Sequence, residues 1–167
     1  MSYRNKTYVA FDGDTDMWAY RIMTAWCENE HIDFDFYNAH DINSARDTSD
    51  VESIKAQLRV RMANAKQMVL LVGENTKGLR KFVPWEIELA RKKDIPIIVA
   101  NLNGKRGYDA DRCPSAVGSD VYTMHVSFQA KIIQYAMDHF AEEYYESKDK
   151  KPENYRYKES VYQELGL

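Results

Sequence analysis

Two short, continuous apolar stretches most constrain the fold of this chain. Gln67–Val72 (QMVLLV) and Ile95–Ala100 (IPIIVA) contain almost no polar residues. Strands that are buried on both faces of a parallel sheet have unbroken apolar sequences of this kind, whereas half-exposed strands alternate. Parallel neighbours need a crossover connection, which is usually a helix. The two stretches therefore predict an α/β protein whose central parallel sheet is covered by helices.

The rest of the chain alternates between strand and helix patterns, and its elements can be stated as ranges. Further strands are expected at Thr7–Phe11, Asp33–Tyr37 and Val121–Phe128, and helices at Met17–Glu30, from Val51 to about Ala65, from the Val83–Glu86 head to about Lys93, and at Gln129–Tyr145. Five strands in this arrangement are typical of a flavodoxin-like doubly wound sheet, for which 2-1-3-4-5 is the common order. Alternating polarity predicts that Val121–Phe128 is an edge strand.

Length and composition favour one domain in the cytoplasm. We expect residues 1–147 to form the domain and residues 148–167, charged and rich in Tyr, to be an extension that packs on it or on a partner. The net charge of −3 argues against broad nucleic-acid binding. No apolar run approaches the roughly 20 residues of a membrane span. Cys27 and Cys113 lack metal-ligand spacing and are interpreted as reduced thiols.

The loops after the first and third strands predict where a ligand binds. In a sheet of this order the crevice lies where the winding reverses, beyond the carboxyl ends of those strands. The turn Asp12–Asp16 and the basic loop Gly73–Phe82 are placed there, and the polar stretch Asn38–Asp50 follows the neighbouring strand. Pro84 favours a helix start after the second loop. Glu86 then lies near the helix head, where the dipole favours an ionised carboxylate.

No standard catalytic motif marks this crevice. The chain has no G-x-G-x-x-G, no G-K-[ST] loop and no identifiable Ser-His-Asp or Cys-His arrangement. A single carboxylate is therefore the best catalytic candidate. Glu86 and Glu88 cannot both face the crevice, because two residues along a helix rotate a side chain by about 200°. The simpler alternative is that Glu86 is an ordinary acidic residue at a helix start.

Several other residues have both a binding and a structural interpretation. The aspartates of Asp12–Asp16 could bind Mg²⁺, but turn formation and helix capping explain them more simply, so no metal is expected. His40 and Asp41 could contact a ligand or form part of a solvated loop. Lys105 and Arg106 could contact phosphate, although an exposed Gly-Lys-Arg turn is the commoner arrangement.

One helical segment has a recognisable spacing. In FVPWEIELA, an aromatic residue is followed four residues later by Glu, then by an aliphatic residue, and then by Ala three residues further on. Phe82, Glu86, Ile87 and Ala90 occupy those places, and Glu88 does not. This segment looks like the helix that carries the catalytic glutamate in TIR domains. YVAFDGDTDMW, VLLVGENT and WEIELARKKDIPIIVANLNGKR extend the match, so that Tyr8–Phe140 resembles the bacterial TIR-like family that includes the TIR component of Thoeris anti-phage systems.

The resemblance implies an enzyme that cleaves the nicotinamide–ribose bond of NAD. Thoeris relatives then cyclise the ADP-ribose into a signal nucleotide. The cationic pyridinium leaves without a proton donor, so one carboxylate that stabilises the oxocarbenium-like transition state replaces the pair used by ordinary glycosidases. The alternative is a TIR-like interaction module without catalysis.

The resemblance also implies partners, and position around the predicted crevice suggests the substrate contacts. NAD is expected as substrate rather than as a bound cofactor, together with self-association and a downstream effector reached through the nucleotide product. The catalytic residue would be Glu86. The expected substrate-binding residues are Phe11, Asp12, Asp16, His40, Phe82 and Trp85, with Lys77, Arg80 or Lys81 near the diphosphate.

Overall fold

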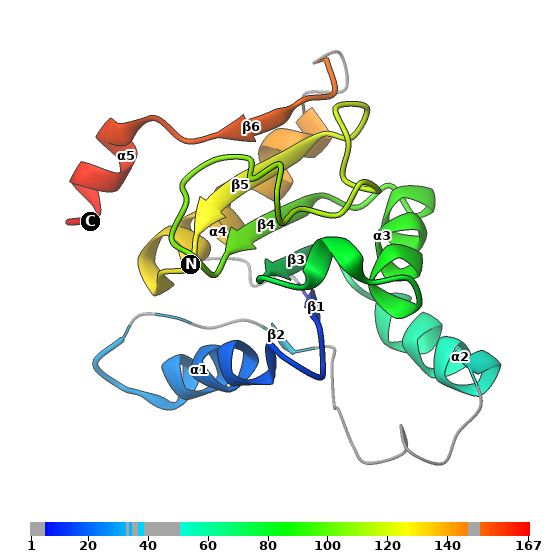
Figure 1. Cartoon of the computed structure of the whole chain (residues 1–167). Coiled ribbons are helices and arrows are strands. Elements are labelled where there is room, and N and C mark those ends of the chain that lie inside the picture. Colours follow the sequence, from blue (N-terminus) through cyan, green and yellow to red (C-terminus); the bar gives the residue numbers. More distant parts are fainter. Residues whose placement is uncertain (1–5, 33, 35–36, 39–50, 147–150) are drawn as a thin grey trace.

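A parallel β-sheet runs through the centre of the computed structural model, which describes residues 6–32, 34, 37–38, 51–146 and 151–167 (Figure 1). Its described strands are β1 (Lys6–Ala10), β2 (Tyr37–Asn38), β3 (Gln67–Val72), β4 (Ile97–Asn101), β5 (Thr123–Ser127) and β6 (Asn154–Arg156). Their order is β2-β1-β3-β4-β5-β6, and every neighbouring pair is parallel. The predicted order 2-1-3-4-5 is confirmed, and β6 adds a strand that the sequence did not predict.

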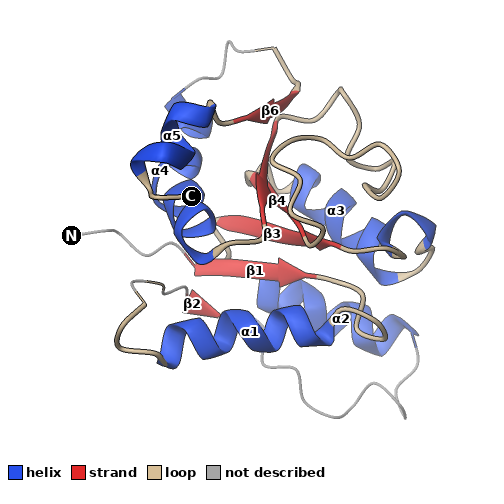
Figure 2. Cartoon of the chain, turned by 60° about the vertical axis from the view of Figure 1, so that its left-hand side comes forward, coloured by secondary structure: helices blue, strands red, loops and turns tan. Residues whose placement is uncertain are grey.

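Helices connect the strands and cover both faces of the sheet. They are α1 (Met17–Glu28), α2 (Val51–Met62), α3 (Phe82–Lys92), α4 (Ala130–Glu146) and α5 (Glu159–Glu164), with a short 3₁₀ turn η1 (Thr76–Gly78) before α3. Figure 2 shows α4 and α5 on one side of the strands and α3 on the other. Among the described residues, no helix combines the length and apolar composition that crossing a bilayer requires.

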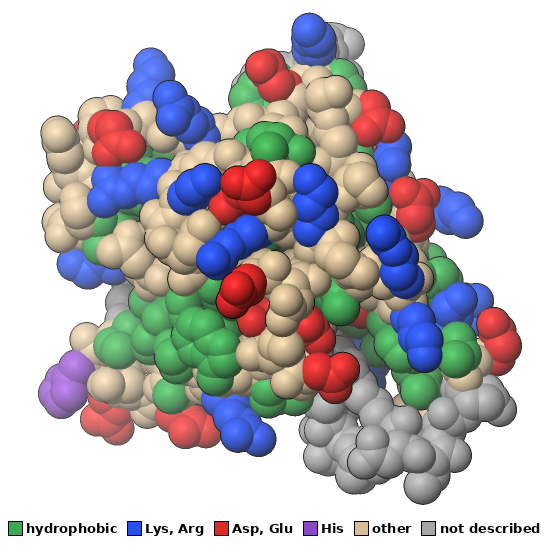
Figure 3. All heavy atoms as spheres, viewed as in Figure 1, with side chains coloured by type: hydrophobic (Ala, Val, Ile, Leu, Met, Phe, Trp, Pro, Cys, Tyr) green, Lys and Arg blue, Asp and Glu red, His purple; other side chains and the backbone are tan. Residues whose placement is uncertain are grey.

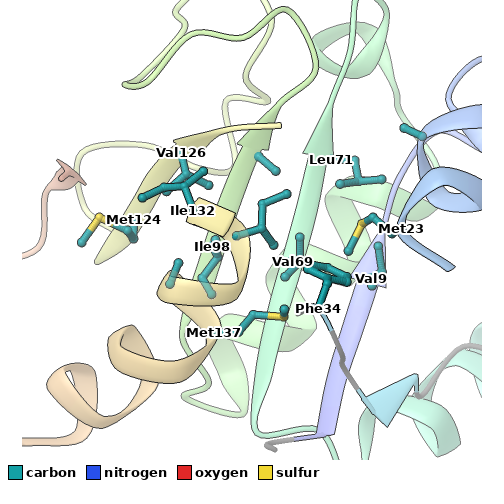
Figure 4. Close-up of a cluster of buried hydrophobic side chains, with 14 of the residues drawn as sticks. Val9, Met23, Phe34, Val69, Leu71, Ile98, Met124, Val126, Ile132 and Met137 are labelled. Carbon is teal, nitrogen blue, oxygen red and sulfur yellow. The ribbon is translucent and has the colours of Figure 1, made fainter. Parts of the chain in front are cut away.

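Alternating side chains of the central strands build two separate cores. Successive residues of a strand point to opposite faces of a sheet. Val69 and Leu71 of β3 therefore join the core under α1 and α4 (Figure 4), whereas Met68, Leu70 and Val72 join the core under α2 and α3. All six residues of β3 are buried, which explains its unbroken apolar sequence.

The prediction that Val121–Phe128 is an edge strand is wrong, because β6 pairs with the outer side of β5. Every residue of β5 is buried, including the polar ones. The Thr123 hydroxyl lies 2.9 Å from both the Asn154 Oδ1 atom and the His125 Nε2 atom. Burial lowers the pKa of His125 to about 4, so its ring is neutral at physiological pH. The polar positions of the alternating pattern thus mark a buried hydrogen-bonded network rather than a solvent-facing side.

The end of the chain packs on the body of the protein. Tyr162 of α5 is fully buried in the core that also contains α4. The Arg106 guanidinium lies 4.2 Å from the centre of the Tyr162 ring and forms a 2.6 Å ion pair with Glu159. These contacts join α5 to the loop that follows β4.

Replacing Tyr162 by Ala is expected to lower the free energy of unfolding by about 3 kcal/mol, because removing a large buried aromatic side chain leaves a cavity. Urea unfolding followed by circular dichroism measures the change. Tyr145, whose side chain is 42% exposed, provides the matched control, and its replacement by Ala is expected to cost much less. Equal losses in the two variants would contradict an integral role for α5.

Candidate functional site

The loop after β1 is held in shape by its own aspartate. Asp12 is 6% exposed, and its two carboxylate oxygens accept hydrogen bonds from the Asp14 amide at 3.0 Å and from the Thr15 hydroxyl at 2.7 Å. A side chain that bonds to the backbone two residues later is the usual device for closing such a turn. The turn-forming interpretation of this loop therefore describes Asp12. No group of three or more potential metal ligands is present among the residues described.

Asp16 and Gly73 bring the ends of β1 and β3 together at the winding reversal. A Cβ atom on residue 73 would lie 2.4 Å from Asp16 Oδ2, so only glycine fits without a shift. The backbone amide of Gly73 donates a 2.8 Å hydrogen bond to the Thr76 hydroxyl, which fixes the start of the second loop. The two loops that the sequence placed at one crevice are therefore in direct contact.

The Asp16 carboxyl is the most perturbed acidic group at this contact. It is 5% exposed, and burial, followed by the charge of Asp12, raises its pKa above the ordinary value. Hydrogen bonds from Thr76 and Thr15, together with the charge of Arg112, oppose that shift without cancelling it. Asp16 Oδ2 has no hydrogen-bond partner in the described part of the chain. A buried carboxylate oxygen without a hydrogen-bond partner is uncommon in proteins and marks Asp16 as a candidate functional residue.

Glu86 is buried on the α2–α3 side of the sheet. Its side chain is 3% exposed, and Oε2 accepts a 2.5 Å hydrogen bond from the hydroxyl of Tyr8, which is itself fully buried on β1. Charged side chains are seldom buried without a partner. A hydrogen bond from a hydroxyl to an ionised carboxylate is stronger than one between neutral groups. Tyr8 therefore ties Glu86 to the strand that begins the crevice. Glu88 points away from the core, where it forms a 3.2 Å ion pair with Arg91.

The helix begins one residue before the predicted Val83–Glu86 head, and Pro84 lies in its first turn as expected. α3 begins at Phe82 and has no acidic residue in its first turn, so Glu86 lies in the second turn. Val83 is buried in the core under α2 and α3, and Phe82 packs against the same core. Apolar packing therefore begins the helix before Pro84. The helix dipole acts mainly on the first turn, so the Tyr8 hydroxyl is the nearer support for the Glu86 carboxylate.

The expected substrate contacts occupy different parts of the fold. Phe11 points to the face opposite Tyr8, where its ring stacks on Tyr20 with centroids 5.0 Å apart. The Trp85 ring lies against α2, with the Arg59 guanidinium 5.3 Å from its centre. His40 lies outside the described residues, as do residues 39–50 of the predicted long loop. Lys77 donates a 2.6 Å hydrogen bond from Nζ to the Ala110 carbonyl.

Three residues at this site were not found by sequence reasoning. Tyr8 lies in a predicted strand, but nothing local marks it as a partner of a residue 78 positions away. Thr76 and Arg112 reach Asp16 from the loops after β3 and β4, and their roles follow from how those loops fold back. The single local signal was the turn-forming character of Gly73 and Thr76. It indicated a loop after β3 but not the contact of that loop with Asp16.

The arrangement combines anionic and cationic groups at one end of the sheet. A buried carboxylate can stabilise positive charge that develops on a nearby sugar ring, because a low dielectric strengthens the interaction. Asp16 can accept hydroxyl donors, and Arg112 supplies a cation beside it. Cys113 is unsuited to nucleophilic chemistry here, since burial raises the pKa of its thiol to about 12.

Comparison with known proteins identifies a family. Residues 8–107 match the family model described as Thoeris protein ThsB, TIR-like domain. No curated protein matches the chain. A crystal structure of a conserved protein from Enterococcus faecalis is similar over 65% of this chain and 69% of that one, with 21% sequence identity and a TM-score of 0.43. That likeness is too distant to carry an argument.

Replacing Gly73 by Ala is expected to lower the free energy of unfolding by about 1–3 kcal/mol, because the new methyl group would overlap the buried Asp16 carboxylate. Thermal or urea unfolding measures the loss. Gly78→Ala is the matched control, since a Cβ there meets no atom within 4 Å. In an Asp16→Ala background the Gly73→Ala cost is expected to shrink. A cost that is unchanged in that background would contradict the contact.

Proposed function

The chain belongs to the family of Thoeris ThsB TIR-like domains, and we propose that it is an NAD-processing enzyme with Glu86 as its catalytic carboxylate. In the proposed reaction the bond between the ribose C1′ and the nicotinamide nitrogen breaks. Its electron pair leaves with neutral nicotinamide, and the ribose becomes an oxocarbenium-like cation. Water then adds at C1′ and releases a proton, or a nucleophilic atom of the ADP-ribose itself closes a ring. The leaving group needs no acid, so one carboxylate suffices.

The observation that carries this proposal is the buried Glu86 carboxylate, held by the Tyr8 hydroxyl. A structural acidic residue on a helix usually lies at the surface, as Glu88 does with its ion pair to Arg91. Burying a carboxylate costs free energy unless its oxygens are well hydrogen-bonded. A dedicated partner that keeps such a group in place is expected where the group has a chemical role.

The other end of the crevice supplies groups that suit the rest of the substrate. Asp16, whose Oδ2 atom has no partner in the described residues, is the proposed acceptor for a ribose hydroxyl. Arg112 lies near Asp16 and can approach the diphosphate. The other predicted contacts with the substrate remain predictions; they are Asp12, Phe82, Trp85, Phe11 and His40.

Membership in a Thoeris family supports a role in anti-phage defence, with the enzyme in the bacterial cytoplasm. In that setting we propose that the product is a cyclic ADP-ribose-type nucleotide that activates a separate effector. Self-association of the TIR-like domain is part of the same proposal.

An assembly module that signals without catalysis is the second candidate. An apolar area on the face shown in Figure 3 favours it. On α1, the Trp18 side chain is 49% exposed and the Ile22 side chain 37%. Phe128 continues this area, with its ring 6.1 Å from that of Trp18. Exposed aromatic surface of this kind often marks a protein interface.

Replacing Glu86 by Gln is expected to reduce nicotinamide release from NAD at least 100-fold, because the amide keeps the shape of the side chain but cannot stabilise the sugar cation. Chromatographic measurement of free nicotinamide with purified protein tests this. Glu88→Gln is the matched control, since that carboxylate lies on the surface of the same helix and its loss should leave the rate unchanged.

Several outcomes of this assay are distinguishable. Equal activity in wild type and Glu86→Gln would eliminate the proposed mechanism. Activity in neither, in protein that circular dichroism shows to be folded, would favour the assembly module. Mass spectrometry of the product separates linear from cyclic ADP-ribose.

Replacing Tyr8 by Phe is expected to lower kcat/KM about 10- to 100-fold, which is the cost of losing a hydrogen bond of about 1.5–3 kcal/mol to a charged group. The acid limb of the pH–rate profile should also move to higher pH, because the hydroxyl stabilises the ionised carboxylate only. Steady-state kinetics over a pH series measure both effects. A lower rate with an unmoved profile would show that Tyr8 contributes packing alone.

A further inference from the structure

A polar pocket lies at the β6 edge of the sheet, and Glu86 is not among its lining residues. Its volume is about 660 Å³, and it is lined by Lys105–Tyr108 from the loop after β4 and by Glu153–Arg156 at β6. The loop after β4 passes across β5 toward β6 (Figure 1), so the pocket depends on the strand that the sequence did not predict. A volume of this size lies within the usual range for small-molecule sites.

The charge of the lining side chains is predominantly positive. Lys105, Arg106 and Arg156 are cations, and Glu153 is the one carboxylate among them. Arg106 is already engaged, because it pairs with Glu159 and covers the Tyr162 ring. The two cations available to bind a ligand are therefore Lys105 and Arg156.

The absence of a side chain at residue 107 leaves room for Arg156 beside the loop that follows β4. A Cβ atom on Gly107 would lie 3.2 Å from Arg156 Cδ, so glycine lets the arginine stem pass close to the loop. Arg156 forms no ion pair within the described ranges. An arginine positioned in a pocket without a carboxylate partner has its guanidinium donors available for an anion.

Lys105 can be released to a ligand at little cost. Its Nζ lies 3.6 Å from Asp109 Oδ1, a long contact for an ion pair, and the lysine side chain is 56% exposed. Asp109 does not depend on that lysine alone. Burial would raise the pKa of Asp109, but hydrogen bonds from Asn103 and the Asp111 amide, with the charge of Lys105, outweigh burial and lower it.

The network beneath the pocket holds the remaining lining groups. His125 lies edge to face with the Tyr108 ring, with centroids 5.6 Å apart, and Asn154 Oδ1 accepts the hydrogen bond from Thr123. Asn154 also lines the pocket, and the hydrogen bond from Thr123 does not use its amide nitrogen. Tyr108 is 45% exposed, so its ring offers a flat surface at the pocket wall.

We propose that this pocket is a second ligand site, which binds a small phosphate-bearing molecule. Arg156 and Lys105 bind the phosphate, and the Asn154 amide donates a hydrogen bond to it. The Tyr108 ring packs against any organic group that carries the phosphate. Charge-assisted bonds from arginine are the usual means of phosphate recognition. The pocket could hold an inorganic phosphate compound or a mononucleotide, and the two are told apart by whether Tyr108 contributes.

Titration of the full-length ¹⁵N-labelled protein with inorganic pyrophosphate and, separately, with ADP tests the site. Saturable amide shifts are expected at residues 105–108 and 153–156 with both ligands, and binding should weaken as salt rises. Arg156→Gln is expected to weaken binding at least tenfold. Arg21→Gln, which removes an exposed arginine on α1, is the matched control and should bind as wild type does.

Two further variants sharpen the result. Gly107→Ala is expected to weaken both ligands modestly, because its Cβ would lie 3.2 Å from Arg156 Cδ and the arginine stem would have to shift slightly. Tyr108→Ala should weaken ADP but not pyrophosphate if a nucleotide is the ligand, and neither if an inorganic phosphate is.

The site stands apart from the proposed catalytic reaction. Glu86→Gln should bind both ligands at residues 105–108 and 153–156 as wild type does, whatever its effect on nicotinamide release. The inference is overturned if neither ligand produces saturable shifts, if the shifts are confined to residues 73–82, or if Arg156→Gln and Arg21→Gln bind equally well.

Discussion

The hydrogen bond from the Tyr8 hydroxyl to the Glu86 carboxylate is the interaction on which the proposed chemistry depends. It joins the strand at the winding reversal to the helix that leaves the next strand. Both partners are buried, so loss of this hydrogen bond would remove a contact from two polar groups that water does not reach. The apolar side chains of Val83, Ile87 and Ala90 turn one face of α3 to the sheet, and Glu86 lies on that buried face whereas Glu88 is at the surface.

Charged side chains approach loops closely at two places in the sheet, one at β1 and β3 and the other at β5 and β6. After β1 and β3, Asp16 and Gly73 meet so closely that residue 73 has no room for a side chain. At β5 and β6 another glycine, Gly107, admits Arg156 to a cationic pocket. In both places the absence of a Cβ atom lets a charged group approach a loop. Specific polar sites on this fold therefore depend on close contact between segments that are distant in sequence.

The pattern of the chain predicted much of the architecture. β3 is buried at all six positions, as its unbroken apolar sequence required, and the strand order of the predicted sheet is confirmed. The edge assignment of β5 failed, because alternation cannot distinguish water from a buried polar partner such as Asn154. The predicted head of α3 at Val83–Glu86 missed one residue, because Pro84 is a local signal and the packing of Phe82 is not.

For the candidate site, local chemistry and the spacing around Glu86 were enough to name a carboxylate and two loops. Hydrophobic periodicity acts over a few residues, so it specifies strands, helices and the edge of the sheet where their loops gather. The partner of Glu86, the contact between Asp16 and Gly73, and the addition of β6 join residues that are distant along the chain. Such pairings depend on distances and packing in three dimensions, and therefore became visible once the elements were assembled.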